Sequence, residues 1–130
     1  MKKRILVLCT GNSARSQIAE GFFRAMGGKT ILVQSAGTHP KKMNPLAIQV
    51  MKEAGINISA QHSKDVASFE GETFDHVITV CDKAKESCPV FPGARITHWN
   101  IPDPVTLEDF RNVRDLLETK TGDFIASEKK

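Results

Sequence analysis

The sequence predicts a single α/β domain built on a four-stranded parallel sheet, in the order 2-1-3-4, with helices packed against it. Short apolar or β-branched runs alternate with segments whose apolar residues recur every three or four positions, as strands alternating with crossover helices do. Apolar residues make up 40% of the 130 residues, which suffices for one buried core. No repeat or linker divides the chain, so residues 1–130 are expected to form one domain.

Four predicted strands supply the sheet. The first, residues 5–8, is wholly apolar, and the other three are the apolar and β-branched stretches 30–35, 76–80 and 95–99. In a parallel sheet of this order, ligands bind beyond the carboxyl ends of the strands. Strands one and three are neighbours about 4.8 Å apart, so the residues that follow them are expected to meet.

The helices are predicted from apolar spacing and from residues that begin or end helices. Asn44 followed by Pro45 is typical of a helix start, and the glycines at 27 and 28 are typical of a helix end. The pattern is weakest over residues 56–72. The expected helices cover residues 16–26, 45–54, 65–69, 81–88 and 107–124, the last with Thr106 as its cap and Gly122 as a weak point near its end.

Composition excludes several classes of protein. The net charge of +3 is scattered and lacks the interleaved aromatic residues that favour nucleic-acid binding. No apolar run approaches the roughly 20 residues of a membrane span. The basic start at residues 1–4 leads into only a short strand, which is not the pattern expected of a signal peptide. We therefore expect a monomeric cytoplasmic protein without nucleic-acid or membrane partners. Thiols stay reduced there, so the three cysteines indicate catalysis, redox cycling or metal binding.

The segment between the first strand and the following helix has the composition of an anion-binding loop. Gly11 and Asn12 tolerate left-handed backbone, so successive N–H groups can turn toward one point. The helix N-terminus adds positive potential, and Arg15 can hold two oxygens of a tetrahedral oxyanion. The same field favours the thiolate of Cys9, the nucleophilic form. The loop comprises Cys9, Thr10, Gly11, Asn12, Ser13, Ala14, Arg15 and Ser16.

Two more cysteines and an aspartate are expected at the same sheet edge. Cys81 follows the third strand, Cys88 comes after six mostly small or polar residues, and Asp103 stands between two prolines after the fourth strand. Together with Cys9, the two cysteines suit a relay in which a disulfide is passed on to an accessible thiol. Structural cysteines are one alternative for Cys81 and Cys88, and a metal site is a second, although no close Cys-x-x-Cys spacing supports it. Asp103 is equally consistent with a turn residue and with a general acid.

The loop sequence Cys-Thr-Gly-Asn-Ser-Ala-Arg-Ser-Gln-Ile-Ala-Glu-Gly, beginning at Cys9, resembles the active-site loop of the low-molecular-weight protein tyrosine phosphatase family. Residues 77–89, which contain Cys81 and Cys88, resemble the redox segment of the thioredoxin-coupled arsenate reductases built on that fold. The similarity covers nearly the whole chain. It implies reduction of arsenate to arsenite, with detoxification of arsenic as the role.

The resemblance also implies a role for each site residue. Cys9 attacks arsenate held by Arg15 and the loop, and Asp103 protonates the departing oxygen. Cys81 then attacks Cys9 and releases arsenite, and Cys88 takes over Cys81 as a disulfide that thioredoxin reduces. Glutaredoxin with glutathione is the less favoured electron donor, and phosphate or sulfate is expected to bind as an analogue of arsenate.

Some positions depart from the family pattern, and others match a metal site. Ala14 stands where many members carry a cysteine, which this relay does not need. Val105 replaces the aromatic residue that helps the phosphatases to bind phosphotyrosine. No tightly bound cofactor is expected, but some members bind a potassium ion near the loop. The matching positions are Asn12, Glu20, Ser35 and Asp65.

Two other functions remain open from the sequence. A small tyrosine or aryl phosphatase would use the loop from Cys9 to Arg15 together with Asp103, without the redox chemistry. A non-catalytic anion-binding module would use the same loop and would not need a thiolate at Cys9.

Overall fold

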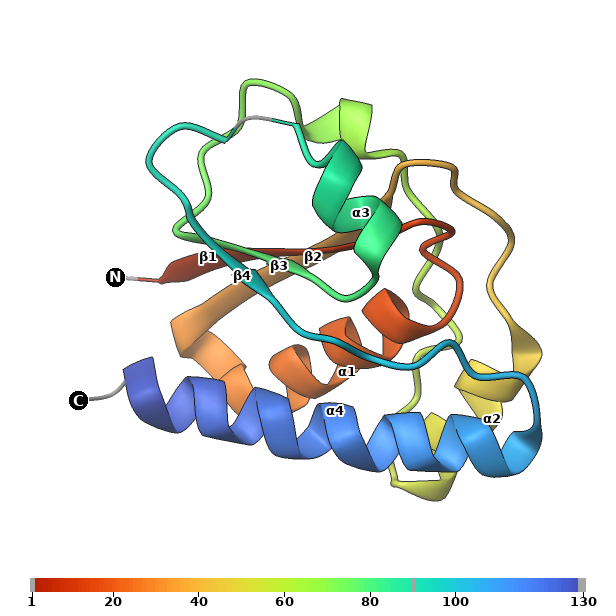
Figure 1. Cartoon of the computed structure of the whole chain (residues 1–130). Coiled ribbons are helices and arrows are strands. Elements are labelled where there is room, and N and C mark those ends of the chain that lie inside the picture. The colour runs from red at the N-terminus through yellow and green to blue at the C-terminus, as the bar shows by residue number, and fades with distance from the viewer. Residues whose placement is uncertain (1, 90, 129–130) are drawn as a thin grey trace.

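The computed structural model describes residues 2–89 and 91–128, and its centre is a fully parallel four-stranded sheet (Figure 1). The strand order is β2-β1-β3-β4, which confirms the predicted order 2-1-3-4. The strands are β1 (Lys3–Cys9), β2 (Ile31–Gly37), β3 (His76–Thr79) and β4 (Arg95–His98).

Strand β1 occupies the middle of the sheet because its side chains are apolar on both faces. Ile5, Leu6, Val7 and Leu8 are completely buried, as is typical of a central strand in a parallel sheet. In the register, Cys9 pairs with Gly37 of β2, and Leu8 pairs with Thr79 of β3. The residues that follow β1, β2 and β3 therefore leave the sheet at one edge.

The helices divide between the two faces of the sheet. Helices α1 (Arg15–Gly27) and α4 (Leu107–Glu128) cover one face, with α2 (Pro45–Glu53) beside them, and the short α3 (Asp82–Ser87) lies on the other (Figure 1). Two 3₁₀ turns complete the chain, η1 (Gly28–Thr30) and η2 (Val66–Phe69). Among the described residues, no helix combines the length and the apolar character needed to cross a membrane.

Aromatic side chains join α1 and α4 to the sheet. Phe23 of α1 stacks on Trp99, with 6.1 Å between ring centroids, and meets Phe124 of α4 edge to face at 5.6 Å. Such pairs contribute about 0.5–1.5 kcal/mol each beyond the area that they bury. This contact packs the second half of α1 against the sheet and α4.

The sequence located the elements well and their ends less well. Asn44 caps α2 through its side chain, which accepts from the N–H of Leu46, and Gly28 adopts φ +54° where α1 ends. The helix expected at residues 65–69 is a single 3₁₀ turn. Gly122 does not weaken α4 enough to end it, because the buried Ile125 anchors the next turn to the core.

The predicted cap of α4 is present and is reciprocal. Thr106 Oγ1 accepts from the N–H of Asp109 at 3.1 Å, and Asp109 Oδ2 accepts from the N–H groups of Thr106 and Val105. The bond from the Thr106 backbone, followed by that from Val105, lowers the pKa of Asp109 below its usual 3.8. The stability that Asp109 contributes is therefore complete above pH 3.8 and is lost as the pH falls through the lower folded value.

We expect Thr106→Ala to lower the free energy of unfolding by about 1 kcal/mol, the usual contribution of a hydroxyl cap. Urea denaturation at pH 7 measures the difference. Thr106→Ser keeps the hydroxyl and serves as the control. Equal stability of the Ala and Ser variants would contradict the role of the cap.

Candidate active site

The loop between β1 and α1 is held open by the segment that follows β2. Four of its carbonyl groups accept hydrogen bonds from residues 38–44. These bonds run from Thr38 N to Cys9 O (3.3 Å), from His39 N to Thr10 O (2.8 Å), from Lys41 N to Gly11 O (2.7 Å) and from Asn44 N to Ser13 O (2.9 Å). In a planar trans peptide, the N–H of the next residue points away from the carbonyl. The N–H groups of residues 10, 11 and 14 therefore turn toward the opposite side, where they can bind an anion, and that of Asn12 turns there toward the Cys9 sulfur.

The Cys9 sulfur lies at the bottom of this loop, and the residue is 4% exposed. It accepts from the N–H of Asn12 at 3.0 Å, and Ser16 Oγ lies 2.8 Å away. Asn12 takes up φ +48°, the left-handed conformation that its residue type tolerates. Its Nδ2 donates to Ser16 Oγ, which leaves the proton of Ser16 for the sulfur. Two donors aimed at one sulfur stabilise a thiolate.

Arg15, the first residue of α1, closes the loop. Its Nη1 donates to the carbonyl oxygen of Ile101 at 2.9 Å, and its Nη2 lies 3.7 Å from Asp103 Oδ1. The arginine side chain is 16% exposed and the aspartate 80% exposed. A guanidinium held by the Ile101 carbonyl group thus lies beside a solvent-exposed carboxyl group, at the positions that the expected anion ligand and general acid would occupy.

Cys81 faces the same space from the end of β3. Thr10 Oγ1 lies 3.2 Å from Cys81 Sγ, and Cys81 is 8% exposed. A cavity of about 390 Å³ contains both sulfurs at its wall. The residues that line it are Cys9, Thr10, Gly11, Ser13, Ala14, Arg15, Lys41, Cys81, Asp82 and Asp103.

Cys88 lies apart from the cavity wall, at the far end of α3, where it is half-buried. Its Sγ donates to the carbonyl oxygen of Pro89 at 3.4 Å. Burial raises the pKa of the Cys88 thiol, so in this conformation it is less reactive than an exposed thiol.

Most of the site residues predicted from the sequence come together here, and some take positions behind the loop. Asn12 and Ser16 are fully buried and contact the sulfur of Cys9 instead of lining the cavity. The sequence analysis did not identify Lys41, whose place on the cavity wall depends on its backbone bond to Gly11. Its only signal was a pair of adjacent lysines, which is common on any surface.

The four side chains considered for potassium are already engaged. Ser35 Oγ donates to Glu20 Oε1 at 2.6 Å, and Asn12 Oδ1 accepts from the N–H of Lys64 at 2.8 Å. Asp65 Oδ1 accepts from the N–H of Ala67 at the start of η2. In this arrangement they do not form an open cage of oxygen atoms, and the potassium site stays a prediction.

Close packing beneath the loop gives a test of its geometry. A methyl group at Gly37 would lie 2.5 Å from the carbonyl oxygen of Thr10 and 3.0 Å from the nitrogen of Asn12. We expect Gly37→Ala to displace the loop, to weaken phosphate binding and to destabilise the fold by about 1–3 kcal/mol. Calorimetric phosphate titration and urea denaturation measure the two effects.

Gly122→Ala is the matched control, because the nearest atom to the added methyl is Met26 Sδ at 4.0 Å. In the middle of α4 this change should stabilise the chain by about 0.5–1 kcal/mol and leave phosphate binding unchanged. Unaltered phosphate affinity in Gly37→Ala would show that β2 does not position the loop.

Comparison with known proteins agrees with this geometry. The chain is 39% identical to an arsenate reductase of Staphylococcus xylosus over 126 residues, which cover 95% of this chain and 96% of the relative. A solved arsenate reductase in the phosphate-binding state superposes with a TM-score of 0.83 at 34% identity, covering 96% of this chain and 98% of the other. A thioredoxin-dependent arsenate reductase from Corynebacterium glutamicum has the same TM-score at 26% identity, covering 97% of this chain and 61% of the other.

The family model described as low molecular weight phosphotyrosine protein phosphatase matches residues 4–130. That match includes β1 from Arg4 onward, the following loop and α1, the Cys81–Cys88 segment and the loop bearing Asp103. The chain therefore belongs to the low molecular weight phosphotyrosine protein phosphatase family.

Proposed function

We propose that this protein reduces arsenate to arsenite through a relay of three cysteines, with thioredoxin as the final electron donor. The observation that carries the proposal is one cavity that holds Cys9, Cys81, Arg15 and Asp103 at its wall, with a third thiol at the other end of α3. A phosphatase needs the first nucleophile, the arginine and the acid, but it has no use for the second thiol.

The first step adds arsenate to the enzyme. The Cys9 thiolate attacks arsenic while Arg15 and the loop N–H groups hold its oxygens. A bond forms between sulfur and arsenic(V), and one oxygen leaves as water after taking a proton from Asp103. The low burial of Asp103 lets solvent return that proton.

The second step reduces arsenic. Cys81 attacks the sulfur of Cys9, a sulfur–sulfur bond forms, and the sulfur–arsenic bond breaks with both electrons remaining on arsenic. Arsenite is released, and the two thiols have supplied the two electrons. Thr10 belongs to the loop and its hydroxyl lies 3.2 Å from Cys81 Sγ, where it can orient the attacking sulfur.

The third step requires α3 to unwind. Seven steps of helical rise separate Cys81 from Cys88, or about 10 Å between Cα atoms, whereas a disulfide needs less than about 7 Å. Helix α3 has six residues, too few to be stable without tertiary contacts. Opening it brings Cys88 to Cys81, frees Cys9 as a thiolate and carries the disulfide toward the surface for reduction.

Thioredoxin is the proposed donor because an exposed disulfide reacts by exchange with an external dithiol. The thioredoxin-dependent relative from Corynebacterium glutamicum supports this choice. A reducing cytoplasm is the compartment in which such a relay would operate.

Arsenate-dependent oxidation of NADPH in the presence of thioredoxin and thioredoxin reductase tests the proposal. We expect turnover with thioredoxin, and little or none with glutaredoxin plus glutathione or without a donor. Brisk hydrolysis of an aryl phosphate without arsenate-dependent NADPH oxidation would instead identify a phosphatase.

A further inference from the structure

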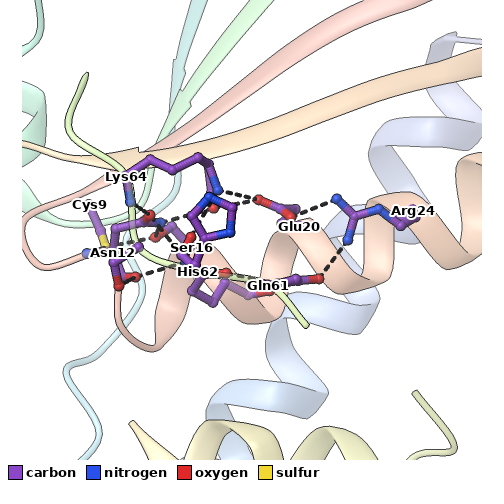
Figure 2. A network of polar contacts seen from close by, with 11 residues as sticks. Cys9, Asn12, Ser16, Glu20, Arg24, Gln61, His62 and Lys64 are labelled. Carbon is purple, nitrogen blue, oxygen red and sulfur yellow. Dashed lines mark hydrogen bonds and ion pairs between the residues drawn. The ribbon is translucent and has the colours of Figure 1, made fainter. Parts of the chain in front are cut away.

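A buried carboxylate lies directly behind the anion-binding loop. Glu20 of α1 is 3% exposed, and two cations reach it (Figure 2). Arg24 Nη2 lies 2.6 Å from Oε2, and Lys64 Nζ lies 3.5 Å from Oε1. The arginine side chain is 54% exposed, whereas the lysine side chain is 17% exposed. Lys64 is therefore the inner partner of the carboxylate.

The backbone fixes where the Lys64 ammonium lies. The N–H of Lys64 donates to Asn12 Oδ1 at 2.8 Å, and its carbonyl oxygen accepts from the N–H of Gly37 at 2.8 Å. Lys64 Nζ also donates to the carbonyl oxygen of His62 at 3.0 Å. The ammonium thus lies between a carbonyl oxygen and a carboxylate oxygen, which are the ligand types of a monovalent metal ion.

A chain of hydrogen bonds joins this ion pair to the nucleophile (Figure 2). Ser35 donates its one proton to Glu20, so its oxygen accepts from Asn12 Nδ2 at 2.9 Å. The second proton of Asn12 Nδ2 goes to Ser16 Oγ, and Ser16 donates to the Cys9 sulfur. A carboxylate at Glu20 can only accept, so it sets the direction of every donor up to the sulfur.

The charge of Glu20 must also be balanced. Arg24 is mostly exposed, so water screens its charge; without Lys64 the carboxylate would be costly to bury and would oppose a second negative charge on the Cys9 sulfur. We propose that Lys64 is a built-in monovalent cation, which neutralises Glu20, keeps the donors aimed at Cys9 and makes bound potassium unnecessary. This role of Lys64 belongs to the loop before an oxyanion binds, so it does not depend on which oxyanion the protein uses.

The first test is the thermal stability of Lys64→Met in chloride salts of potassium, sodium and choline at equal ionic strength. We expect a Tm about 5 °C below that of the wild type in choline, since a buried carboxylate loses its inner partner. Potassium should restore about half of the loss and choline none, because the ion can occupy the vacated position. Lys52→Met, on the exposed side of α2, is the matched control and should show neither effect.

The wild type provides a test that needs no variant. Its Tm should agree within about 1 °C in the three salts, since Lys64 already supplies the charge. Selective stabilisation of the wild type by potassium would overturn the proposal, even if Lys64→Met does not fold. A Lys64→Met variant that loses equal stability in all three salts would show an ordinary ion pair and would overturn it as well.

The rate at which Cys9 reacts is a further test, because it would not change if Lys64 only stabilised the fold. Iodoacetamide labelling at pH 6, with the Cys9 peptide quantified by mass spectrometry, reports the thiolate. We expect labelling of Lys64→Met to be about tenfold slower in choline, to recover in potassium, and to be near normal in Lys64→Arg. An unchanged labelling rate in Lys64→Met would overturn the link between Lys64 and Cys9.

Discussion

Cys9→Ser is expected to abolish arsenate reduction and aryl phosphate hydrolysis together, with a loss of activity on the order of 10⁴-fold or more. Both reactions begin with attack by the same sulfur, and a serine hydroxyl remains protonated where the N–H of Asn12 and the hydroxyl of Ser16 stabilise a thiolate. The coupled NADPH assay and an aryl phosphate assay measure the two losses.

Phosphate binding is the control that distinguishes loss of the nucleophile from disruption of the loop conformation. The bonds from residues 38–44 to the loop carbonyls do not involve the sulfur, so the variant should bind phosphate within about threefold of the wild type. A variant that keeps its biological function along with binding would indicate an anion-binding module. Retained turnover would show that Cys9 is not the nucleophile.

The sequence predicted the sheet because its strongest signals are local. An apolar run such as residues 5–8 is typical of a strand buried on both faces, and Asn44 with Pro45, or Thr106 before the last helix, marks a helix start within a few residues. The anion-binding loop could be predicted for the same reason, since Gly11, Asn12 and Arg15 lie within one short segment.

The supporting contacts of the site could not be predicted because they join segments far apart in the chain. Lys41 reaches the cavity through a backbone bond to Gly11, and neither residue type specifies that pairing. Lys64 meets Glu20 only after α1, β2 and α2 have packed. The continuation of α4 beyond Gly122 also depends on tertiary structure, because burial of the next turn outweighs the low helix propensity of one glycine.

Cys88→Ser is expected to stop the catalytic cycle after one turnover. Cys9 and Cys81 can still deliver two electrons, so each enzyme should release about one equivalent of arsenite and then remain as a Cys9–Cys81 disulfide. That disulfide joins two buried residues, 4% and 8% exposed, where an external dithiol has poor access. Multiple turnover with thioredoxin should therefore fall by about 100-fold or more.

Phosphatase activity separates the roles of the three thiols, because hydrolysis needs Cys9 alone. Cys88→Ser should hydrolyse an aryl phosphate at a rate within about twofold of the wild type, since Cys88 lies outside the cavity wall. Cys81→Ser is the matched variant: it should lose even the single equivalent of arsenite, because no second thiol is present to break the sulfur–arsenic bond. Peptide mapping of arsenate-treated Cys88→Ser should identify the Cys9–Cys81 disulfide. Unimpaired turnover of Cys88→Ser with thioredoxin would remove Cys88 from the relay and require the buried disulfide to be reduced directly.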